Sequence, residues 1–212
     1  MNNPFKEKAY ELKCKTVMKG IKKRNMNPYY CSTKEEAADL VMQMIGENDV
    51  VSWGGSVTID ELGVKEKIVE KGIKVIDRDS APTIEENFQR RREGLLADVY
   101  LTSANAVTTD GELVNIDGLG NRVAAMAYGP NKVIFVVGAN KICFDVDSAF
   151  KRIRTAACPE NAQRTDQKTP CRVTGKCANC IDGTMCGVFQ VIRHSQLPDR
   201  IHVIMVAEDL GY

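Results

Sequence analysis

The sequence predicts an α/β fold, an open and mostly parallel sheet with helices on both faces. Short apolar runs alternate with longer segments whose apolar residues recur at helical spacing, and this alternation is typical of parallel strands joined by helices. The apolar runs are strand-sized: VIFVVGA at 133–139 is far below the roughly 18 to 20 residues that a membrane-spanning helix requires. At 212 residues the chain suits one domain, 1–212, with a cysteine-rich insertion at 160–190.

The elements follow in order along the chain. A helix rich in Lys and Glu, expected to face solvent, comes first, and a turn is expected at Asn27-Pro28. Ser32-Thr33 followed by Glu35-Glu36 indicates a capped helix start. Helices are expected at 6–24, 35–45, 61–72, 84–97, 122–129 and 144–157, and strands at 49–53, 74–79, 98–108, 132–141 and 201–207.

Composition excludes several function classes. Lys and Arg total 29 against 28 Asp and Glu, so the net charge is +1, and no long basic or acidic run favours nucleic acid or an anionic membrane surface. The charged N-terminus has no apolar signal core, which predicts a cytoplasmic protein without a membrane span. Rossmann, Walker and serine-elbow motifs are absent from the sequence.

Four segments resemble one known family. They are WGGSVTIDELG (53–63), LTSANAVTTDGELVNIDGLGNRVAAMAYGP (101–130), VIFVVGANKI (133–142) and the block at 169–212. They resemble the lactate utilisation (LUD) domain family, in particular small single-domain members similar to lactate utilisation protein C. The resemblance implies the superfold of sugar isomerases, CoA transferases and formyltetrahydrofolate cyclo-ligases. It also implies a link to the oxidation of L-lactate to pyruvate beside iron-sulfur partner subunits.

Candidate substrate-binding residues fall where predicted strands end, which is where open parallel sheets bind ligands. After the strand at 49–53, Gly54 and Gly55 would let the backbone approach a carboxylate or phosphate that Ser56 could also bind; a plain tight turn is the alternative. Asn105 lies toward the end of the strand expected at 98–108 and Lys141 at the end of the strand expected at 132–141, and both are expected to face the same cleft. Lys141 could neutralise a carboxylate or, if desolvated, form an imine; an ordinary strand-end lysine is the alternative.

The loop ahead of the helix at 122–129 is the strongest of these motifs. It packs polar side chains and glycines directly before an apolar helix, and such a loop can hold a substrate against a helix terminus. A capping turn made by Asp117 or Asn121 is the alternative. The candidates are Asn115, Asp117, Gly120, Asn121 and Arg122.

Catalytic acids and bases are harder to place. Glu61, with Asp60, could act as an acid or base if the cleft raises its pKa, although acids at a helix N-terminus are also favoured by the helix dipole. The candidate catalytic set is Glu61, Asp117 and Lys141.

Four of the eight cysteines are crowded into sixteen residues. Cys171, Cys177, Cys180 and Cys186 have the spacing C-x5-C-x2-C-x5-C, and four thiolates select zinc or an iron-sulfur cluster. Free or redox-paired thiols are the alternative, but they would leave a polar, Gly-rich loop with little to order it. A 4Fe-4S cluster suits the resemblance, and structural Zn fits the same ligands. The loop is expected to lie near the residues at 118–122.

The other cysteines are scattered, and each is expected to be a small buried hydrophobe; Cys158 also stands close to the cluster at the end of a predicted helix.

Two functions therefore stand side by side. The first is a redox-associated metal protein for a small 2-hydroxy acid such as L-lactate. The alternative is a non-redox enzyme or binding module for a small anionic metabolite, with zinc fixing the loop. A carboxylate- or phosphate-bearing metabolite is the expected ligand in both, and a homo-oligomer is compatible with either.

Overall fold

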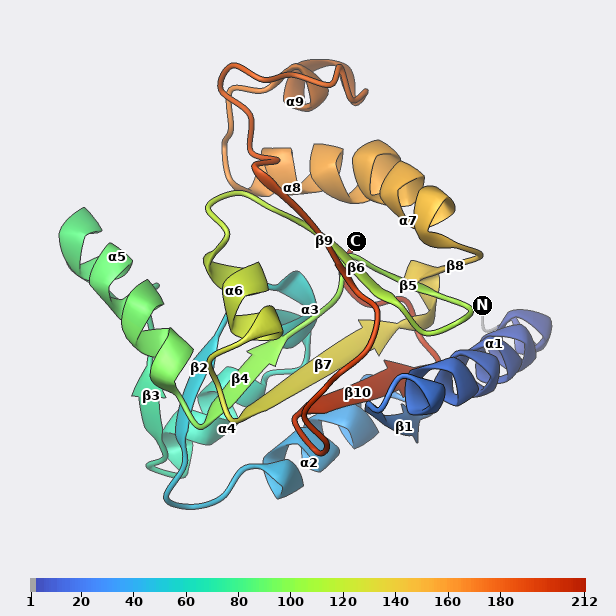
Figure 1. Cartoon of the computed structure of the whole chain (residues 1–212), viewed down its shortest axis with the longest axis horizontal. Helices are drawn as coiled ribbons and strands as arrows, with labels where there is room; N and C mark the ends of the chain where they lie inside the picture. The colour runs from blue at the N-terminus through green and yellow to red at the C-terminus, as the bar shows by residue number, and fades with distance from the viewer. Residues whose placement is uncertain (1–2) are drawn as a thin grey trace.

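A six-stranded sheet in which all neighbouring strands are parallel forms the centre of the molecule (Figure 1). The computed structural model describes residues 3–212. The strand order is β1 (Asn27–Cys31), β10 (Ile201–Val206), β7 (Lys132–Gly138), β4 (Val99–Thr102), β2 (Val50–Trp53) and β3 (Lys74–Ile76). The fold class predicted from the sequence is therefore confirmed.

Helices cover both faces of this sheet, and the central strand β7 shows why. Its odd-numbered residues Val133, Phe135 and Val137 are fully buried on one side, and Ile134 and Val136 are fully buried on the other. Each such side chain stabilises the fold by about 1.5 to 3 kcal/mol relative to exposure. The first side is covered by α1 (Pro4–Lys23) and α6 (Asn121–Ala127), and the second by α2 (Lys34–Met44), α3 (Val57–Glu61) and α4 (Val64–Glu70).

Helix α1 is less solvent-facing than the sequence indicated. Its start is capped by the Asn3 side chain, and one face buries Cys14, Val17 and Ile21 against the sheet. Gly20 on the same face touches the backbone of the turn at 109–111: a Cβ placed there would lie 2.3 Å from the Asp110 carbonyl oxygen. Glycine is therefore required where this helix meets the turn.

The edge strand β1 was not expected. Asn27-Pro28 indicated a turn, whereas the structure pairs residues 27–31 with β10 in parallel register. Proline lacks an N–H, which an edge strand tolerates on its unpaired side. Helix α5 (Ile84–Glu93) agrees with the prediction; it buries no residue and is followed by a short 3-10 turn, η1 (Gly94–Leu96).

A second, four-stranded sheet was also missed. Its order is β8 (Ile142–Cys143), β5 (Ala106–Thr108), β6 (Leu113–Asp117) and β9 (Val188–Ile192), with β6 antiparallel to both of its neighbours. Residues 115–117, expected in a polar loop, thus belong to a strand whose first four residues are buried. Helix α7 (Val146–Arg152) packs on this sheet through Ala149.

The cysteine-rich segment, residues 160–190, contains more helix than its composition indicated. Helix α7 continues through a π-helical turn, η3 (Ile153–Ala157), into α8 (Cys158–Arg164), and α9 (Pro170–Thr174) follows. In Figure 1 this segment lies beyond one end of the central sheet, at the top of the view. Among the helices of residues 3–212, none combines the length and apolar character needed to cross a membrane.

Candidate functional site

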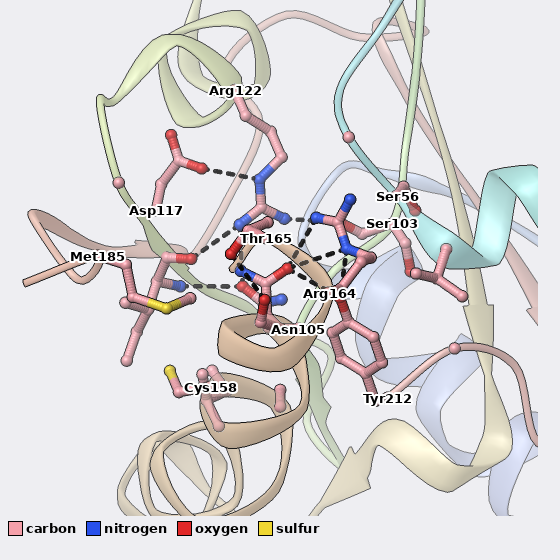
Figure 2. A pocket seen from close by; sticks show the side chains of 18 of the residues that line it. Ser56, Ser103, Asn105, Asp117, Arg122, Cys158, Arg164, Thr165, Met185 and Tyr212 are labelled. Carbon is pink, nitrogen blue, oxygen red and sulfur yellow. Dashed lines mark hydrogen bonds and ion pairs between the residues drawn. The ribbon is translucent and has the colours of Figure 1, made fainter. Parts of the chain in front are cut away.

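A pocket of about 290 Å³ lies at the carboxyl ends of the central strands (Figure 2). Residues just after β2 (55–58), β4 (103–105), β7 (141) and β10 (211–212) line it. Parallel strands place their carboxyl ends at one edge, so segments far apart in sequence meet there. Helix α8 and residues 185–186 of the cysteine-rich segment close the opposite wall.

Most of the substrate-binding candidates meet around this pocket. The candidates that line it are Gly55, Ser56, Asn105, Asp117, Asn121, Arg122 and Lys141. The other four, Gly54, Glu61, Asn115 and Gly120, stand behind the lining.

These four residues support the wall. A Cβ at Gly54 would lie 3.1 Å from the Arg122 side chain, so this glycine leaves room for that side chain. Asn115 is fully buried, and its Oδ1 accepts the Asn105 N–H at 3.1 Å. Glu61 Oε2 accepts the Gly211 N–H at 2.8 Å and so anchors the C-terminal residues.

Gly120 begins α6 with φ +92°, a backbone conformation that glycine adopts without steric cost. Its N–H donates to Asp117 Oδ2 at 3.0 Å.

Asp117 and Arg122 form a closed ion-pair network. Arg122 Nε donates to Asp117 Oδ1 at 3.0 Å, and Nη2 donates to Asn105 Oδ1 at 3.0 Å and to the Ile116 carbonyl at 2.8 Å. Both side chains of the ion pair are nearly buried, with exposures of 13% for Asp117 and 11% for Arg122. With both carboxylate oxygens accepting hydrogen bonds, Asp117 holds the loop and Arg122 in place.

Ser56 has a capping role. Its hydroxyl accepts the Ile59 N–H at 3.4 Å at the start of α3, and its side chain also borders the pocket.

Lys141 is a buried and strongly perturbed cation in the pocket. Its side chain is 3% exposed, and Nζ donates to Thr58 Oγ1 at 2.7 Å and to Ser103 Oγ at 3.1 Å. Burial, followed by repulsion from Arg152 and Arg122, lowers the pKa of Lys141 to about 7. Near neutral pH this lysine can therefore serve as a cation for a carboxylate or as a neutral amine.

Three further arginines line the pocket and were missed in the sequence. Arg78 follows the short strand β3, Arg91 projects from α5, and Arg164 ends α8. Arg164 Nε donates to the Tyr212 hydroxyl at 2.8 Å and to Asn161 Oδ1 at 3.2 Å. The position of Arg78 after a strand was a usable signal, whereas nothing in the local sequence pointed to Arg91 or Arg164.

The cysteine-rich segment touches the pocket, as expected. Gly187 N–H donates to the Asp117 carbonyl at 2.8 Å, and a Cβ at Gly187 would lie 2.3 Å from the Gly118 carbonyl oxygen. This close backbone approach brings Cys186 and Met185 into the lining. The expected proximity of the cysteine loop to the residues at 118–122 is therefore what the structure shows.

Cys158 belongs with the clustered cysteines. Its Sγ lies 3.6 Å from Cys186 Sγ, and both residues line the pocket. The hydrogen bond with Cys186 and burial raise the pKa of Cys158 far above its usual range, and negative charge at Cys171 and Cys177 raises it further. The same hydrogen bond lowers the pKa of Cys186 to about 7. By contrast Cys14 and Cys31 are buried hydrophobes, and burial raises the pKa of each to about 11.

The four predicted metal ligands all lie in the cysteine-rich segment, but their sulfur atoms are not arranged around a common point. Cys171 is buried beside the Thr169 hydroxyl, at 3.2 Å, and Cys177 Sγ accepts a hydrogen bond from Arg154 Nε at 3.4 Å. Cys180 is half-buried and has no such contact within the described chain. Across residues 3–212, no three Cys, His, Asp or Glu side chains converge as a metal site. The donor chemistry fits a thiolate-bound metal, while the side chains are not gathered around one.

Comparison with known proteins identifies the family. The model of the LUD domain matches residues 14–206. The chain belongs to the LUD domain family. The resemblance seen in the sequence is thereby confirmed, and membership links the chain to lactate utilisation. No curated protein matches the sequence.

The fold of this LUD domain is shared with a solved structure. A DUF162 family protein from Deinococcus radiodurans superposes with a TM-score of 0.55 at 15% identity, over 93% of this chain and 98% of that one. At this identity the likeness concerns the fold alone.

Proposed function

We propose that this LUD domain binds a small 2-hydroxy acid, L-lactate or a similar compound, in the strand-end pocket, and that it takes part in oxidising that acid together with a metal centre on its cysteines. The observation that carries the proposal is the make-up of the pocket. Five cationic side chains line the pocket together with the thiols of Cys158 and Cys186.

The residues around Lys141 are suited to binding a carboxylate. Lys141 can neutralise a carboxylate, and the nearby Ser56 and Ser103 hydroxyls can bind carboxylate or hydroxyl oxygens. Near pH 7 the neutral form of Lys141 can also accept a proton from the substrate hydroxyl. Lys141 is therefore the proposed catalytic base. Asp117 and Glu61 hold the wall of the site.

The proposed metal centre is inferred from the thiolate groups of the four clustered cysteines. Cys171, Cys177, Cys180 and Cys186 are the proposed ligands of a 4Fe-4S cluster, which when bound would accept single electrons. Oxidation of a 2-hydroxy acid to a 2-oxo acid releases two electrons and two protons; Lys141 would take the proton of the hydroxyl group, and the proton of the C–H bond would pass to solvent water. A single cluster held by these cysteines would accept only one of these electrons at a time, so the proposal includes iron-sulfur partner subunits as the onward acceptor.

One observation favours the second candidate, a non-redox enzyme or binding module with structural zinc. Two sulfurs bound to one tetrahedral zinc at about 2.3 Å lie about 3.8 Å apart. The Cys158–Cys186 distance of 3.6 Å is close to that value.

Anaerobic purification separates the two candidates. The proposal predicts brown protein whose visible absorption is bleached by dithionite and which holds about four iron atoms per chain, together with saturable L-lactate binding in calorimetry. Colourless protein with about one zinc would establish the second candidate. Lys141→Met should weaken lactate binding at pH 6, whereas Lys151→Met, an exposed lysine on α7, serves as the matched control. Unchanged lactate affinity in the Lys141 variant would rule out its assigned role.

A further inference from the structure

We infer that the pocket is built for a short carboxylic acid that carries a second, doubly charged oxyanion such as a phosphate ester. This inference rests on the proposed function, since it assumes that the pocket holds a small acid, and it specifies the ligand class. The phosphate site is formed by Arg78, Arg91 and Arg164 at the Gly55 turn.

The pocket lining carries more positive charge than one bound carboxylate would neutralise. Five cationic side chains, those of Arg78, Arg91, Arg122, Arg164 and Lys141, face a single lining carboxylate, that of Asp117. This carboxylate is paired with Arg122, and one carboxylate of the ligand would be matched by Lys141. Three arginines remain for a further anion, and the only ion pair among them is the long contact, 3.4 Å, between Arg78 and the half-exposed Asp79 within the described residues.

Arg78 is the residue that most needs a partner. Its side chain is only 15% exposed, and its Nε is buried with no hydrogen-bond partner within residues 3–212. The nearest carboxylate oxygen, Asp79 Oδ1, is 3.4 Å from Nε but is not aligned to accept its hydrogen. A buried N–H without an acceptor is costly, and a bound oxyanion would supply the acceptor.

Arg78 and Arg164 converge on Gly55. A Cβ at this position would lie 2.7 Å from Arg78 Nη2 and 3.8 Å from Arg164 Nη2, so glycine lets both guanidinium groups approach the backbone here. Arg164 is fixed through Nε and Nη2 by Asn161 and Tyr212, while its Nη1 donates to no atom of the described chain. Figure 2 shows Arg164 reaching into the pocket from the side of α8.

Arg91 completes the group. Its Nε and Nη1 donate to Asn87 Oδ1 at 2.6 Å and to Asn121 Oδ1 at 3.1 Å, so the guanidinium is held in place. Burial, followed by repulsion from Arg78, lowers the pKa of Arg91. A dianion placed between the two side chains would relieve that repulsion.

A phosphate ester suits this arrangement better than a second carboxylate. It carries nearly two charges at neutral pH and offers three acceptor oxygens, and guanidinium groups bind such oxygens in pairs. The ligand class is therefore a short hydroxy acid with its carboxylate toward Lys141 and its phosphate toward Gly55.

Calorimetry on the full chain tests the inference with three probes: L-lactate, inorganic phosphate and 3-phosphoglycerate, a 2-hydroxy acid bearing a phosphate. We expect 3-phosphoglycerate to bind at least about tenfold tighter than L-lactate, and inorganic phosphate to compete with it. Arg78→Gln should weaken 3-phosphoglycerate by roughly tenfold or more and change L-lactate by less than about threefold. Arg92→Gln removes the same charge from an exposed position on α5 and should change neither.

Each outcome bears on a different claim. Equal affinity for L-lactate and 3-phosphoglycerate, or unchanged phosphate-ester affinity in Arg78→Gln, overturns the inference and leaves the proposed function standing. No binding of any probe overturns both. Tight 3-phosphoglycerate binding without L-lactate binding supports the inference and removes lactate from the proposed function. If Arg78→Gln does not fold, Gly55→Ala provides the test, because its methyl group must displace the flexible end of Arg78.

Discussion

Lys141 makes the stability of the protein depend on pH in a defined direction. Burial, with the charges of Arg152 and Arg122, lowers its pKa from 10.5 to about 7 in the folded protein. In the unfolded chain the lysine keeps its ordinary pKa, so between these two values the unfolded state binds more protons than the folded state. The free energy of unfolding therefore rises as the pH increases above 7. Below pH 7 the folded protein bears the full cost of the buried charge.

The size of this effect follows from the shift. One pKa unit corresponds to about 1.4 kcal/mol, so Lys141 contributes roughly 1.5 kcal/mol of added stability between pH 7 and pH 8.5. The Cys186 thiol, with a pKa lowered to about 7, adds a contribution of the same sign. Comparison with Lys141→Met isolates the lysine, because the variant keeps the thiol.

Urea unfolding at the two pH values, under reducing conditions, measures the difference. Trp53 is the single tryptophan and is 4% exposed, so its fluorescence reports the loss of the core. We expect the wild type to gain about 1.5 kcal/mol more than Lys141→Met between pH 7 and pH 8.5. Hydroxyl groups left without their lysine partner affect the variant equally at both pH values, so the change with pH is the readout. An equal change in both proteins would refute the reasoning.

Three further outcomes are expected. Replacing Cys177 and Cys180 by Ser should release the metal and make the cysteine-rich segment sensitive to limited proteolysis; unchanged metal content in the double variant would contradict the ligand assignment. Arg200→Met should destabilise the protein by about 3 kcal/mol or more in urea, because Arg200 is 6% exposed and donates to two backbone carbonyls in the last turn of α6 and to the carbonyl of Pro130 after it. Gly20→Ala should cost at least about 2 kcal/mol in thermal unfolding, since its methyl group would meet the Asp110 backbone at 2.3 Å; a loss below about 0.5 kcal/mol would show that the helix and turn separate easily.

The strand-end rule predicted the cleft because it depends only on local patterns. Strands buried on both faces are readable as short apolar runs, and in a parallel sheet their carboxyl ends meet at one edge. Ser56, Asn105 and Lys141 could therefore be placed around one pocket before their contacts were known. Asp117 was found by the same reasoning, but its pairing with Arg122 depends on where α6 starts, which the polar loop did not reveal.

The features that were missed depend on distant pairing. Strand β9 pairs with β6 across more than seventy residues, and β5 is three residues long, so neither carries a periodic signal of its own. Turn chemistry at Asn27-Pro28 concealed β1, whose pairing with the last strand of the chain decides its conformation. Arg164 is a pocket residue only because α8 folds back over the sheet edge, and a surface arginine on a helix has no distinguishing local pattern.

Helix α8 carries both a cysteine and an arginine that line the pocket. Cys158, Asn161 and Thr165 are spaced by three and four residues, so they share one helix face, and all three line the pocket. The π-helical turn η3 directly precedes this face, and such turns are frequent at functional sites because the extra residue rotates the side chains of the next helical turn. Arg164, the last residue of α8, is tied to the C-terminal residue by its bond to the Tyr212 hydroxyl. One helix therefore carries Cys158 at one end and the Arg164 guanidinium at the other. If the cysteines bind a metal and the arginines bind an anion, both ligands would contact side chains near α8, and each would then favour the helix position that the other requires.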